Sequence, residues 1–161
     1  MFVPFEEISD NARLWIYQAD RKFNDQEVNQ IENELKTFVN AWAAHGAPLQ
    51  ASFKILHNQF VVLAVDEAFN AASGCSIDDS VHIIKVLEDK LKVNFFDRTK
   101  IAFIFNNEVF IESLSNLKTK VEEGTIKKDT LTFNNLVKNK RELETQWVVP
   151  AKDTWISRYF D

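Results

Sequence analysis

Three residue types that can cooperate in nucleophilic catalysis are predicted to meet at one edge of a sheet in this 161-residue chain. Cys75 stands at the start of a predicted helix, whose dipole favours a thiolate. His45 ends an earlier predicted helix, and Asp66, or its neighbour Glu67, follows an apolar strand. A histidine beside a thiol acts as a base, and a carboxylate orients it. These residues predict a small cysteine-dependent hydrolase or acyl transferase. The competing interpretation, which we favour, is a buried, inert cysteine in a turn of small residues, with Asp66 and His45 capping or bonding loops.

A second group, two Asp-Arg pairs, is predicted at the opposite edge of the sheet. Asp20 and Arg21 follow the first predicted strand, and Asp97 and Arg98 precede the last one. They are expected either to form crosswise bidentate ion pairs or to present arginines to an anionic ligand. We prefer the ion pairs, because an arginine beside an aspartate is normally neutralised locally.

No metal site and no cofactor is expected from the sequence. The three histidines stand at positions 45, 57 and 82, and none has a close-spaced partner of the kind that metal sites use.

Hydrophobic spacing predicts the two helices that would position these groups. Apolar residues recur at positions 28, 31, 35, 38 and 42, which is one face of a helix. Asn24 with Glu27 predicts a capping box at its start, and His45-Gly46 predicts its end. The second helix has apolar residues from position 77 to 91, with Ser76 as the expected N-cap.

Four strands are predicted, over residues 13–18, 51–57, 60–65 and 101–105. The second alternates apolar and polar residues, as an edge strand does, and the third is apolar on both faces, as a central strand is. The element order is strand, helix, strand, strand, helix, strand. It predicts a ferredoxin-like α/β sandwich (βαββαβ) with an antiparallel sheet of order 4-1-3-2. An open α/β sheet of another order is the alternative.

The predicted organisation is one domain, with a ferredoxin-like core over residues 1–112 and a mainly helical C-terminal extension over 113–161. The end of the chain is rich in large apolar residues, which predicts that it packs against the open sheet face or against a second copy. These residues are Trp147, Trp155, Ile156, Tyr159 and Phe160.

Composition narrows the function classes. The net charge of −5 and the lack of a basic patch argue against a nucleic-acid partner. No apolar run is long enough to span a membrane, and a single cysteine fits a reducing compartment. We therefore expect a soluble cytoplasmic protein, either a module that binds a protein partner, a small ligand or a second copy of itself, or the cysteine-dependent enzyme above.

Four stretches together resemble a family of short, uncharacterised bacterial proteins that are often labelled "ABC transporter ATPase". They are Trp15–Arg21 (WIYQADR), His45–Leu49 (HGAPL), Ser73–Asp78 (SGCSID) and Phe95–Thr99 (FFDRT). The resemblance covers nearly the whole chain but implies no established chemistry.

The ATPase label can be tested on the sequence. A phosphate-binding loop requires two glycines five positions apart, the second followed by lysine. The only glycines are Gly46, Gly74 and Gly124, so this loop is missing, and so is the ABC signature Leu-Ser-Gly-Gly-Gln. The sequence therefore predicts that the chain has no ABC-ATPase activity.

Overall fold

The computed structural model describes residues 1–161 and shows an α+β protein whose strands form three antiparallel sheets. The chain divides into two compact units. The first unit comprises residues 1–96 and 138–141, and the second comprises residues 97–137 and 142–161. These bounds differ from the division after residue 112 that the sequence suggested, and that division into a core and an extension stays a prediction.

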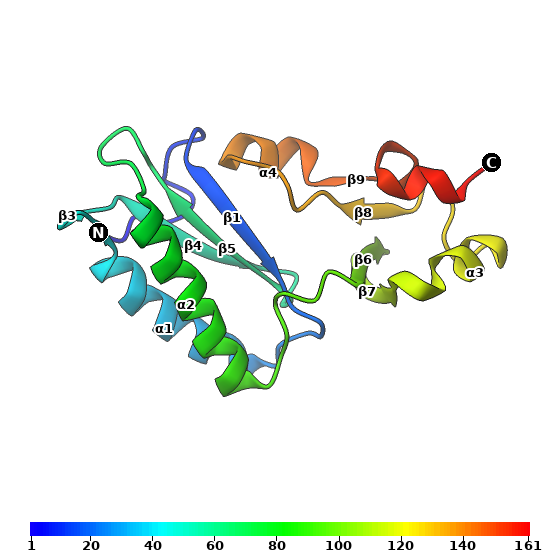
Figure 1. Ribbon diagram of the computed structural model, residues 1–161, viewed down its shortest axis with the longest axis horizontal. Helices are drawn as coiled ribbons and strands as arrows, with labels where there is room; N and C mark the ends of the chain where they lie inside the picture. The colour runs from blue at the N-terminus through cyan, green and yellow to red at the C-terminus, as the bar shows by residue number, and fades with distance from the viewer. The chain divides into compact units, whose positions relative to one another are not determined.

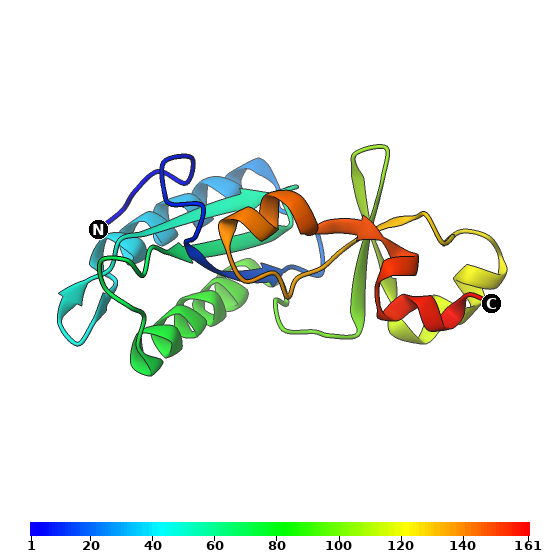
Figure 2. The same cartoon turned by 90° about the horizontal axis from the view of Figure 1, so that it is seen from above.

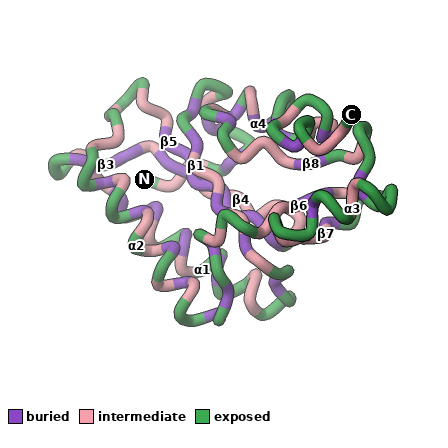
Figure 3. The backbone as a smooth tube through the Cα atoms, turned by 45° about the vertical axis from the view of Figure 1, so that its right-hand side comes forward, coloured by how far each residue is buried: buried purple, intermediate pink, exposed green.

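The first unit is built on a three-stranded antiparallel sheet with β5 in the middle (Figure 1). Its strands are β1 (Arg13–Gln18), β4 (Ala51–Leu56) and β5 (Phe60–Val65), in the spatial order β1-β5-β4. β5 is buried along its whole length (Figure 3), as a strand that is apolar on both faces should be. β4 and β5 pair as a hairpin, and the predicted edge position of β4 and central position of β5 are confirmed.

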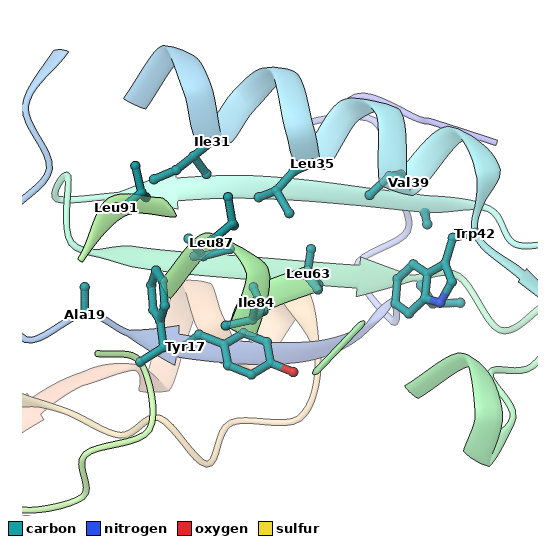
Figure 4. Close-up of a cluster of buried hydrophobic side chains, with 14 of the residues drawn as sticks. Tyr17, Ala19, Ile31, Leu35, Val39, Trp42, Leu63, Ile84, Leu87 and Leu91 are labelled. Atoms are coloured by element: carbon teal, nitrogen blue, oxygen red, sulfur yellow. The ribbon is translucent and has the colours of Figure 1, made fainter. Parts of the chain in front are cut away.

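Two helices, α1 (Asp25–Ala41) and α2 (Gly74–Leu91), lie on one face of this sheet (Figure 1) and enclose the core of the first unit. The core-facing side chains come from both helices and from all three strands. Those in the middle of it, shown in Figure 4, include Ile31, Leu35, Leu63, Ile84 and Leu87. The predicted capping box of α1 is present, since Asn24 Oδ1 accepts the Glu27 N–H at 2.8 Å and Glu27 Oε1 accepts the Asn24 N–H at 2.9 Å.

The predicted end of the first helix is wrong. α1 ends at Ala41, and His45 and Gly46 form the turn of a small hairpin between β2 (Ala43–Ala44) and β3 (Ala47–Pro48). Both turn residues have positive φ, 51° and 78°, as the two central residues of a type I′ turn require. The glycine therefore serves a hairpin turn instead of a helix terminus.

The predicted sheet order 4-1-3-2 is also wrong in its fourth strand, which belongs to a sheet of the second unit. Within the first unit, a short returning stretch lies at the outer edge of β1. Asn139 forms an antiparallel bridge with Arg13, and the Leu14 N–H donates to the Lys138 carbonyl at 3.0 Å. Apart from the small β2–β3 hairpin, the order β1, α1, β4, β5 and α2 is that of a ferredoxin-like fold, but the fourth strand of such a fold does not join this sheet.

The second unit contains a four-stranded antiparallel sheet of order β7-β6-β8-β9. Its strands are β6 (Lys100–Phe105), β7 (Glu108–Ser113), β8 (Leu131–Phe133) and β9 (Val148–Pro150). The helical elements are short: η1 (Leu114–Asn116), α3 (Leu117–Glu122), α4 (Lys140–Gln146), which begins in the first unit, η2 (Ala151–Asp153) and η3 (Trp155–Tyr159).

The C-terminal residues are ordered and pack into the core of the second unit. Ala151 and Ile156 are buried in one cluster with Phe103, Leu117 and Ile126. The aromatic residues of this segment divide between core and surface. Trp147 is buried against Phe133, with ring centroids 4.6 Å apart, whereas the side chain of Trp155 is exposed.

Candidate functional site

Cys75 lies in the first turn of α2 and is exposed, so the expected burial of this cysteine is wrong. The helix begins earlier than predicted, because Ser73 and not Ser76 is its N-cap. The Ser73 hydroxyl accepts the Ser76 N–H at 3.1 Å, and the Ser76 hydroxyl accepts the Ser73 N–H at 2.7 Å. The Trp42 indole N–H donates to the Ser76 carbonyl at 2.8 Å, which fixes this turn beside the β2–β3 hairpin.

The β2–β3 hairpin, which carries His45, meets the β5–α2 loop at one end of the first unit (Figure 2). Asp66 begins this loop, and Cys75 follows it. No hydrogen bond or ion pair joins the three side chains. His45 is exposed at the tip of the hairpin. The Asp66 carboxylate accepts the Ala68 N–H at 3.1 Å, which shapes its own loop. This arrangement can expose a thiol, but it supplies no contact through which a base would activate it.

Arg21 binds within the first unit. Its guanidinium forms a forked pair with Glu27, at 2.9 and 2.8 Å, and also donates to the Leu91 carbonyl at 2.6 Å. The arginine, together with the Asn24 N–H, holds the pKa of Glu27 at about 2. Asp20 accepts the Asn94 N–H at 3.0 Å. Both residues of this pair thus join the loop after β1 to the end of α2, so the crosswise partner expected for Arg21 is replaced by Glu27.

Asp97 and Arg98 lie at the start of the second unit. The Asp97 carboxylate accepts hydrogen bonds from Thr99, at 2.9 Å from its N–H and 2.6 Å from its hydroxyl, and these bonds lower the pKa of Asp97. Arg98 is exposed. The aspartate therefore shapes the turn that leads into β6.

His57 lies in the three-residue turn between β4 and β5, with a positive φ of 53°. Burial lowers the pKa of His57, and the nearby Lys22 ammonium lowers it further. Both effects favour the neutral imidazole. Its ring lies edge-on to Phe60, with centroids 6.3 Å apart, which is a packing role at the hairpin.

A cluster that the sequence only hinted at lies on η3. The Arg158 guanidinium lies 5.2 Å from the centre of the Trp155 ring and 5.5 Å from that of Tyr159, and the two rings meet edge-on at 6.3 Å. Residues three and four positions apart share a face of a short helix, and the Thr154 hydroxyl caps that helix. We call Trp155, Arg158 and Tyr159 the aromatic patch. The aromatic residues were noted from the sequence, but the arginine that joins them was not.

Comparisons with protein-family models, with curated proteins and with solved structures find no match to this chain. No group of three or more histidine, cysteine, aspartate or glutamate side chains is arranged to hold a metal ion. No helix has both the length and the apolar character needed to cross a bilayer.

Proposed function

We propose that this chain is a non-catalytic binding module that engages a protein partner through the aromatic patch of η3. The observation that carries the proposal is the trio of Trp155, Arg158 and Tyr159, in which the guanidinium lies over both rings, Trp155 is 46% exposed, Arg158 is exposed and Tyr159 is half-buried. Tryptophan, tyrosine and arginine are the residue types that dominate binding energy at protein interfaces. Because the rings and the guanidinium already hold one another, little side-chain freedom is lost on binding.

The charges around the patch favour an acidic partner segment. The Lys152 N–H donates to the Lys128 carbonyl at 3.0 Å, so the two backbones that carry these exposed lysines are adjacent just before η3. With Lys127 and Arg158 they make four cations, against three acids, Asp129, Asp153 and Asp161, in the same stretches. This excess of positive charge is local, since the chain as a whole is acidic. Opposite charge at the rim of an interface steers association and selects the partner.

Binding to an array of synthetic acidic peptides, each with one central aromatic residue, tests the proposal. The Trp155 fluorescence and its indole signal should change on binding, and Trp155→Ala should weaken binding about tenfold or more, as loss of an interface anchor does. Phe105→Ala is the matched control, because Phe105 is an exposed aromatic residue of the same unit. The proposal fails if no peptide binds, or if Trp155→Ala binds as the wild type does.

A related expectation concerns nucleotides. The three glycines do not form a phosphate-binding loop, so we infer that the module has no ABC-ATPase activity. Calorimetry with ATP and magnesium should give no binding heat, and micromolar binding would contradict this inference.

A further inference from the structure

The β5–α2 loop, residues 66–73, presents an exposed phenylalanine on a braced backbone. Phe69 is 67% exposed. Its neighbour Asn70 donates from Nδ2 to the Pro48 carbonyl at 2.8 Å, which fastens the loop to the β2–β3 hairpin. Glu67 accepts the Ala72 N–H at 2.9 Å and lies 3.7 Å from the Arg13 guanidinium. Because the loop is held on both sides of Phe69, the ring is displayed in a defined position.

The surroundings of Phe69 in the sequence are acidic. Between Lys54 and Lys85 the chain contains no lysine or arginine, and it contains four acids, Asp66, Glu67, Asp78 and Asp79. The last two are exposed near the start of α2, beside the end of the loop. Figure 1 shows this loop and the start of α2 at the end of the first unit that also carries the β2–β3 hairpin.

We propose that the Phe69 loop of one chain docks on the aromatic patch of a second copy of this chain. The inference rests on the proposed function, because it names the occupant of the patch. The two surfaces are opposite in charge, and both present aromatic side chains. One offers a ring within an acidic stretch, and the other offers rings and a guanidinium beside exposed lysines. An aromatic side chain gains from contact with aromatic faces and with arginine.

The contact is heterologous, since it joins two different surfaces, so it adds chains head to tail. One loop on one short helix buries less area than the roughly 1,200 Å² of a stable complex, which makes the association weak and transient. Because part of the attraction is between exposed charges, raising the salt concentration weakens it.

The single cysteine permits a direct test. One sample, which contains no ¹⁵N, carries a nitroxide on Cys75, close in sequence to Phe69. This sample is mixed with a second one, the ¹⁵N-labelled Cys75→Ser protein. Only contacts between chains can then broaden the ¹⁵N signals. The indole signal of Trp155 and the amide signals of η3 should broaden as the concentration of the spin-labelled chain rises. Phe69→Ala in the spin-labelled chain should remove the broadening, and Phe105→Ala, at 68% exposure a matched exposed phenylalanine, should leave it unchanged.

The inference is overturned if the η3 signals do not broaden at the highest attainable concentration, or if Phe69→Ala broadens them equally. Its failure can be told apart from failure of the proposed function. If acidic peptides still bind and Trp155→Ala removes that binding, the patch remains a binding site and the second copy is rejected as its occupant.

Discussion

The two units of this protein solve the problem of burying apolar surface in different ways. In the first unit, two helices of 17 and 18 residues close over a sheet, and all three strands of that sheet and both helices contribute to the core. The second unit has short helical elements, and its core cluster is centred on Phe103 with Leu117, Ile126, Ala151 and Ile156. The comparison suggests that long periodic elements form a stable core to which many side chains contribute. A small core depends on a few large side chains and leaves other aromatic residues at the surface.

The largest expected effect tests that dependence directly. Phe103→Ala should destabilise the second unit by about 3–5 kcal/mol, because Phe103 is fully buried and is the largest buried side chain of this cluster. Amide hydrogen exchange should accelerate in residues 97–137 and stay slow in the first unit. Leu35→Ala, in the core of the first unit, is the reciprocal control, with an expected cost of about 2–5 kcal/mol. Equal acceleration in both units from Phe103→Ala would contradict the division between them.

A second prediction concerns the returning stretch of the first unit. The buried Lys140 ammonium donates to the carbonyls of Glu6 at 3.3 Å and of Ile8 at 3.0 Å. Lys140→Met keeps the apolar stem but leaves two acceptors without this donor, which should cost about 1–3 kcal/mol in chemical denaturation.

Lys54→Met is the matched control for Lys140→Met. Lys54 lies 5.3 Å from the same Phe5 ring that Lys140 approaches at 5.4 Å, but its side chain is more exposed. Its exposed ion pair with Glu6 should contribute much less to stability, because solvent screens it. Equal losses from the two substitutions would mean that the Lys140 ammonium does not fasten the N-terminal segment.

A smaller effect is expected at the Arg21–Glu27 pair, which joins the loop after β1 to the start of α1. The folded pKa of Glu27 is about 2, below the ordinary 4.5. Since the folded pKa is depressed, the stability from this pair is fully present above about pH 4.5 and is lost as the pH falls toward 2. Glu27→Gln should cost about 1 kcal/mol near neutral pH, allowing for solvent around the exposed arginine, and almost nothing near pH 2. A cost independent of pH would contradict the assignment.

The sequence predicted the first unit far better than the second, for a physical reason. The helix face at positions 28 to 42 and the alternation of 51–57 against the apolar run of 60–65 are strong periodic signals, and each gave the correct element and position. The fourth strand was assigned to the wrong sheet because an isolated apolar stretch, Ile101 to Phe105, does not indicate which edge it will join.

The candidate site residues also could not be placed from local sequence alone. His45-Gly46 has the composition of a helix end and of a hairpin turn alike, so local sequence could not decide between them. Arg21 pairs with Glu27, six residues along the chain, and this pairing depends on where α1 begins in space. The aromatic patch depends on the three-residue and four-residue spacing of η3, which is too short an element to produce a recognisable period.

The smallest expected effect bears on whether the first unit carries chemistry. Cys75 is exposed, and no hydrogen bond joins it to His45 or Asp66. Iodoacetamide should therefore alkylate native Cys75, since the thiol is accessible, and His45→Ala should leave both the rate and its pH profile unchanged. Asp66→Asn should likewise change neither, although it weakens the hydrogen bond to Ala68 within the loop. The measurement is the alkylation rate by mass spectrometry from pH 5 to pH 9. Rapid alkylation near pH 6 that His45→Ala abolishes would support the cysteine-dependent enzyme and would make the first unit the catalytic part of the molecule.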